Sequence, residues 1–202
     1  MSRYTGPRLK RVRRLDHALP GLTRKGRKAR EGMPGVHPFR RQKLSEYGLR
    51  LREKQRLRVN FGVTERQLRN LVQRAKAARG DTGVALISML ESRLDNVVFR
   101  ACFAPTIPAA RQLVAHGHVL VDGKKCDIPS RRITAGQRIE LRPNARKFKI
   151  VLDCLEYFRG EPIPSFLDVQ PNDFTIGMLS APGREDTLMD VDMNLVIEFY
   201  SR

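Results

Sequence analysis

The chain has 202 residues, a formal net charge of +18 and 41% hydrophobic residues, which together describe a folded and strongly basic protein. No stretch approaches the roughly 18 consecutive apolar residues that span a bilayer, and the N-terminal region lacks the apolar segment of a secretory signal peptide. The three cysteines lie far apart, which indicates neither a disulfide framework nor a zinc cluster and favours a reducing compartment.

The charge falls into three zones along the chain. Residues 1–90 carry 24 basic and 6 acidic residues, residues 91–150 carry 12 and 5, and residues 151–202 carry 3 and 10. A basic excess of this size is typical of a surface that binds a polyanion, because neutralised phosphates release condensed counterions. We therefore expect nucleic acid as the partner, ahead of an anionic membrane surface or an acidic protein.

The first predicted unit is a basic arm over residues 1–43. It contains 14 basic residues and only two acids, without a sustained apolar periodicity. Low apolar content leaves too little burial to offset chain entropy, so we expect an extended arm that orders against its partner. Its candidate RNA-binding residues are Arg3, Tyr4, Arg8, Arg11, Arg13, Arg14, Lys25, Arg40, Arg41 and Lys43.

Residues 44–90 form the predicted helical domain. Ser45 can cap a densely basic helix that runs to residue 58, and Thr64 with Gln67 forms a capping box for a second helix that stops before Gly80. A third apolar run, over residues 87–101, is expected either to span residue 91 as one helix or to break near it. The candidate RNA-binding residues here are Ser45, Tyr47, Arg50, Arg52, Lys54, Arg56 and Arg58.

Residues 91–150 read as a compact RNA-binding module. Thr106 can cap a short helix that ends at Gly117, and two short strands follow, joined by the turn Asp122-Gly123. A further strand is expected over residues 138–141. Because RNA is read largely through its backbone shape and 2′-hydroxyls, a small sheet lined with cations suits it. The candidate residues are Arg111, Gln112, His116, His118, Lys124, Lys125, Arg131 and Arg132.

The acidic segment over residues 151–202 is expected to contain a helix, loops and a closing strand at residues 195–200. Its carboxylates are scattered, with no phosphate-binding loop, nucleophile–base pair or metal-ligand spacing, so we expect no enzyme. The isolated His17 and His37, and the pair His116 and His118 with no third ligand, do not indicate a metal site. We expect neither a metal nor another cofactor.

Several long blocks of sequence resemble small-subunit ribosomal protein four of bacteria and organelles. They are RYTGP at residues 3–7, LSEYGLRLREKQRLR at 44–58, GVTERQLRN at 62–70, LESRLDNVVFR at 90–100, ARQLVAHGHVLVDGKKCDIPS at 110–130 and VIEFYSR at 196–202. The resemblance covers essentially the whole chain. No cysteine precedes Cys102, so the chain is similar to the zinc-free branch and to its cyanobacterial and plastid members.

The resemblance implies a structural constituent of the small ribosomal subunit, cytoplasmic or in the plastid stroma. This protein would be a primary ribosomal RNA binder that nucleates assembly of the subunit body at a helix junction of the 5′ domain. It further implies contact with small-subunit protein five, support for translational accuracy, and a place for Arg40, Arg41 and Lys43 near the path by which messenger RNA enters. A repressor that binds its own messenger RNA through the same surface remains an alternative. A membrane-associated protein is disfavoured, because the arm has no leucine-rich or aromatic face.

We therefore predict an α+β protein in four parts. A basic extended arm (1–43) leads into an α-helical domain (44–90). An inserted module of one helix and a small antiparallel sheet (91–150) follows, and an acidic C-terminal segment (151–202) packs back on the helical domain.

Overall fold

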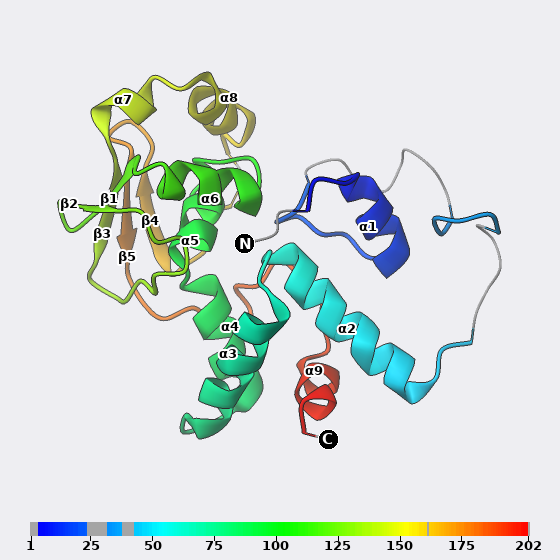
Figure 1. The fold of residues 1–202 in the computed structure, drawn as a ribbon. Helices are drawn as coiled ribbons and strands as arrows, with labels where there is room; N and C mark the ends of the chain where they lie inside the picture. Colours follow the sequence, from blue (N-terminus) through cyan, green and yellow to red (C-terminus); the bar gives the residue numbers. More distant parts are fainter. Residues whose placement is uncertain (1–3, 24–31, 38–42, 161, 202) are drawn as a thin grey trace.

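A computed structural model of the chain describes residues 4–23, 32–37, 43–160 and 162–201 (Figure 1). It confirms the α+β class and divides the apolar residues between two hydrophobic cores. We call them the helical core, which contains Val12, Leu57 and Val196, and the module core, which contains Leu94, Val119 and Met178. Phe99 packs against both and joins them.

The helical core is built by helices from both ends of the chain. Ser45 caps the second of them by accepting a hydrogen bond from the Gly48 amide, and Thr64 and Gln67 form the predicted capping box of the third. The apolar run over 87–101, for which the sequence left both a continuous and a broken helix open, is broken, because Ser92 and Arg93 separate two helices. The helices of this core are α1 (Arg8–Leu15), α2 (Glu46–Asn60), α3 (Glu65–Ala77), α4 (Thr82–Glu91) and α9 (Met193–Phe199).

Part of the predicted arm belongs to this core. Residues 8–15 form α1, and Val12, Leu15, Leu19 and Leu22 are all buried, so this stretch is not extended. These four residues recur at the helical spacing of three or four, although the helix itself ends at Leu15, and the many cations between them concealed this apolar pattern. The expectation of an extended, coreless arm is therefore wrong for residues 8–22.

The module core lies between two helices and an antiparallel sheet. The predicted hairpin forms around Asp122 and Gly123, both of which adopt positive φ angles as a two-residue turn requires. Thr106 caps the next helix, as predicted. The elements are α5 (Leu94–Arg100), α6 (Ile107–Ala115), β1 (Val119–Val121), β2 (Lys124–Cys126), β3 (Arg138–Leu141), α7 (Pro143–Arg146), α8 (Lys149–Tyr157), β4 (Leu167–Gln170) and β5 (Thr175–Met178).

The C-terminal segment is shared between the two cores. The sheet order is β2-β1-β3-β5-β4, so strands from residues 167–178 extend the predicted three strands. Val151, Phe166 and Ile176 lie in the module core, whereas among the described residues of this segment those that reach the helical core begin at Met189. The expectation that all of 151–202 packs on the helical domain is corrected accordingly. The predicted closing strand at 195–200 is also wrong, because Asp192 caps α9 there.

Candidate nucleic-acid interface

A group of cationic and aromatic side chains gathers where α6 ends and β1 begins. Gly117 has a φ of +72°, which lets the chain turn sharply out of the helix. Lys125 from β2 lies directly over this glycine. The approach is so close that a Cβ placed on Gly117 would be 2.3 Å from the lysine Cε. Arg142, just after β3, donates from Nη1 to the Gly117 carbonyl at 3.4 Å. Three segments of the module thus converge on one glycine.

Two histidines complete this group, which we call the module cluster: His116, His118, Lys125 and Arg142. The His118 ring meets Phe148 edge to face with centroids 4.9 Å apart, and His116 lies 6.1 Å from His118. Among the residues that the structure describes, none of the four side chains pairs with a carboxylate. The cluster is therefore a concentration of donors and positive charge with one aromatic support.

The electrostatics of His118 reflect these neighbours. Burial lowers its pKa from the ordinary value, and the positive charges of His116, Arg142 and Lys125 lower it further. The neutral imidazole is favoured in the absence of a ligand. An anion placed between these side chains would have the opposite effect, because it would stabilise the imidazolium.

The hairpin presents further cations beside the cluster. Lys124 is exposed, and the turn that carries it is held by Asp122, which accepts hydrogen bonds from the Arg138 amide at 2.9 Å and from Gln137 Nε2 at 2.8 Å. These two bonds lower the pKa of Asp122, so it stays ionised. Gln112 and Arg132 are exposed and Arg131 is half-buried.

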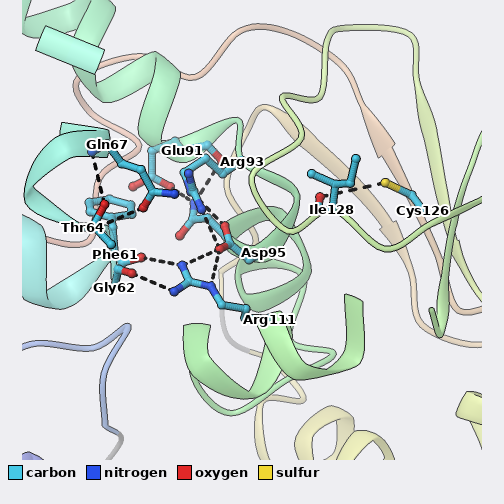
Figure 2. Close-up of polar contacts among 11 residues, drawn as sticks. Phe61, Gly62, Thr64, Gln67, Glu91, Arg93, Asp95, Arg111, Cys126 and Ile128 are labelled. Carbon is cyan, nitrogen blue, oxygen red and sulfur yellow. Dashed lines mark hydrogen bonds and ion pairs between the residues drawn. The ribbon is translucent and has the colours of Figure 1, made fainter. Parts of the chain in front are cut away.

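Arg111, a candidate RNA-binding residue, is paired inside the protein. Its guanidinium donates to Asp95 Oδ2 at 2.7 Å, to the Gly62 carbonyl at 2.7 Å and to the Phe61 carbonyl at 3.1 Å (Figure 2). Asp95 is fully buried and also accepts two hydrogen bonds from Arg93. Arg111 therefore connects α6 to the turn between α2 and α3, and its guanidinium N–H groups donate to acceptors within the protein.

Several cations of α2 are likewise paired within the chain. Arg50 donates to Glu198 at 2.8 Å, and Lys54, almost fully buried, donates to Glu65 at 2.9 Å. Burial of Glu65 opposes the effect of its hydrogen bonds from Tyr200 and Lys54, and the net result is a lowered pKa. The sequence predicted a cationic helix whose basic side chains bind RNA. In the structure, glutamates of α9 and α3 pair with two of these side chains.

Of the remaining candidates on and beside α2, some pair with other groups of the protein and others are exposed to solvent. Arg56 pairs with Glu53 and donates to the Leu15 carbonyl, and Arg58 lies 3.8 Å from Glu65. Arg52 is half-buried. Ser45 serves as the helix cap, while Tyr47 and Lys43 are exposed at the start of the helix.

The N-terminal candidates lie on α1 and its approach. The Arg11 guanidinium stacks on the Tyr4 ring, with 3.3 Å between Cζ and the ring centroid, and Arg8 donates to the Leu22 carbonyl. Arg13 is half-buried and Arg14 is exposed. The candidates Arg3, Lys25, Arg40 and Arg41 lie outside the described residues.

Sequence reasoning missed Arg142, which lies just after a short strand in a stretch whose other basic residues were not singled out either. It also left unassigned the exposed basic face of α3, whose apolar stripe drew attention to the core alone. In the described ranges, no three His, Cys, Asp or Glu side chains are placed to hold a metal, and no helix is long and apolar enough to cross a membrane.

A buried carboxylate marks the boundary between the two cores. Glu91 accepts a hydrogen bond from Asn96 Nδ2 at 2.6 Å and lies 3.9 Å from Arg100 Nε. Burial outweighs the attraction of Arg100 and raises the pKa of Glu91 to about 7. Arg100 also donates to the Asp186 carbonyl, so this group links α4, α5 and the C-terminal segment.

The whole chain resembles characterised ribosomal proteins. Residues 3–91 match the ribosomal protein S4/S9 N-terminal domain and residues 92–139 match the S4 domain. Small ribosomal subunit protein uS4 of Synechocystis sp. is 48% identical over 202 residues, covering 100% of this chain and 99% of the relative. The proteins of the same name from Nostoc sp. and Synechococcus elongatus are also 48% identical with the same coverage. These matches are to ribosomal proteins and not to enzymes, and the chain belongs to the uS4 family of small ribosomal subunit proteins.

Proposed function

We propose that this protein is a structural constituent of the small ribosomal subunit and binds its ribosomal RNA through the module cluster. The observation that carries the proposal is the convergence of Lys125, Arg142 and two histidines on Gly117 with no carboxylate partner among the described residues. Uncompensated cations that several elements hold together are what a phosphate backbone requires.

The chemistry of the cluster fits an RNA strand better than a point anion. Lys125 and Arg142 supply charge to phosphates, while His116 and His118 can donate to phosphate or 2′-hydroxyl oxygens. Phe148 fixes the His118 ring, which limits the entropy lost on binding. The exposed side chains of Lys124, Gln112 and Arg132 are further candidate contacts on the module, and Tyr47 with Lys43 offers another near the start of α2.

The family resemblance supports finer assignments as part of this proposal. The protein would nucleate assembly of the subunit body at the 5′ domain and support translational accuracy. The acidic C-terminal segment would face a basic neighbouring protein, such as small-subunit protein five, because its negative charge repels RNA. Messenger RNA would pass near Lys43. The protein would work within the ribosome of a cytoplasm or a plastid.

Crosslinking in growing cells, followed by sequencing of the bound RNA, tests the partner. Reads concentrated in small-subunit ribosomal RNA are the expected result. Reads confined to one leader transcript would instead support the repressor alternative, and a broad set of transcripts would contradict both.

A binding assay tests the surface. The variant Lys125→Gln with Arg142→Gln should lose affinity for a transcript of the 5′ domain, and the control Arg159→Gln with Arg184→Gln removes two exposed cations from the acidic segment. If the two variants bind equally well, the module cluster is not the contact.

A further inference from the structure

The half of α3 that faces away from the core is strongly cationic. Leu68, Val72 and Ala75 are buried in the helical core and define the inner side of the helix. At ~100° per residue, four exposed basic side chains lie outside this buried stripe, with Arg66 and Arg74 on the far side of the helix and Arg69 and Lys76 on one flank. We call these four side chains the α3 basic face.

These cations lack the carboxylates that accompany those of α2. Arg50, Lys54 and Arg56 on α2 each pair with a glutamate. By contrast, no side chain of the α3 basic face is within ion-pair distance of a carboxylate in the described ranges. Lys76 donates only to the Ser201 hydroxyl, at 2.9 Å. Solubility does not require four unpaired cations within three turns of one helix.

The α3 basic face is separate from the module cluster. In Figure 1, α3 lies at the lower end of the molecule, whereas α7 and α8, which flank the end of the module with Arg142 and Phe148, lie at the upper end. An RNA strand bound at the module cluster therefore does not explain the charge of the α3 basic face. Arg66 and Lys76 are about 15 Å apart along the helix axis, a length over which a nucleic-acid strand presents several phosphates.

We propose that the α3 basic face binds the phosphate backbone of ribosomal RNA as a second contact. This inference rests on the proposed function. Between the cations the exposed side chains are polar or small, namely Asn70, Gln73 and Ala77, so the face has no apolar surface to insert into a lipid interface. Contacts of this kind position the RNA through its charge and carry no base specificity.

The test uses exposed residues whose side chains make no described hydrogen bond, so that folding is preserved. The variant is Arg66→Gln with Arg74→Gln, and the matched control is Arg159→Gln with Arg184→Gln, which removes the same charge from exposed positions of the acidic segment. Binding of the full-length proteins to a 5′ domain transcript is measured across a salt series. Circular dichroism checks that each variant is folded.

We expect the α3 variant to lower the slope of log K against log salt by about 1.4–1.8, since each lost phosphate contact removes roughly 0.7–0.9. At 0.1 M salt this corresponds to roughly 25- to 60-fold weaker binding. A slope equal to that of the control overturns the α3 contact and leaves the proposed function standing. Equal losses in both variants overturn it too, because net charge alone would then explain them. If the wild-type chain does not prefer this transcript to unrelated RNA, the proposed function itself fails.

Discussion

Replacement of Arg111 by methionine should destabilise the fold without removing an RNA contact. The substitution removes hydrogen bonds to Asp95 Oδ2 and to the carbonyls of Phe61 and Gly62, and leaves Asp95, which is fully buried, with Arg93 as its charged partner. Loss of one member of a buried ion pair costs about 3–5 kcal/mol. Arg111 is 27% exposed, so we reduce the expected loss to ~2–4 kcal/mol because solvent screens part of the interaction.

Urea denaturation followed by circular dichroism measures this loss as a lower transition midpoint. The neighbouring substitution Gln112→Ala, on the exposed side of α6, is the control and should change the free energy of unfolding by less than about 0.5 kcal/mol. Under conditions in which the Arg111 variant is still folded, its affinity for the 5′ domain transcript should fall no more than about twofold. Loss of a charged RNA contact would instead weaken binding roughly tenfold. A stability loss below about 1 kcal/mol together with tenfold weaker binding would refute the structural role.

Three further predictions follow from single groups. Glu91 has a pKa of about 7 in the folded chain against an ordinary value of 4.5, so the folded state binds the proton more tightly and stability should fall by ~1–3 kcal/mol as the pH rises from 4.5 to 7. Denaturation at a series of pH values should show this decline and its loss in Glu91→Gln. RNA affinity should rise as the pH falls below 6.5, because the pKa of His118 is lowered from that ordinary value and its ring gains charge only below it. Titration of binding with His118→Gln should show a flatter response, and an unchanged response would place His118 outside the contact. Thr64→Ala should cost about 1 kcal/mol in thermal unfolding, since it removes the α3 cap, and a Tm equal to that of the wild type would contradict the cap.

The sequence contained enough local information for most elements of the module and the helical domain. Ser45, Thr64 and Thr106 each start a helix by accepting a hydrogen bond from an amide three residues ahead, so their effect depends on near neighbours alone. The Asp122-Gly123 turn is equally local, since both residues tolerate the positive φ angles it requires. The basic charge of the N-terminal zone, and with it the expectation of a polyanion partner, also depended on the sequence alone.

Only part of the candidate site could be predicted from the sequence. His116, His118 and Lys125 were named from the sequence because they flank a helix end and a hairpin. Arg142 was not, because only the pairing of β1 with β3 brings it against Gly117. Its sequence neighbours do not indicate that contact.

Tertiary structure decided which cations are free to bind and where the C-terminal segment belongs. Glu198 lies 148 residues from Arg50, and Asp95 lies 16 residues from Arg111, so no local pattern could reveal that these arginines are already paired. Strand β5 forms because β3 offers it an edge, and β4 in turn pairs with β5, whereas α9 forms a helix because Asp192 caps it and α2 covers its apolar side. The physical reason is that hydrogen-bond caps and turns act over three or four residues, whereas ion pairs, sheet edges and cores are completed by whichever distant residues the fold brings into contact.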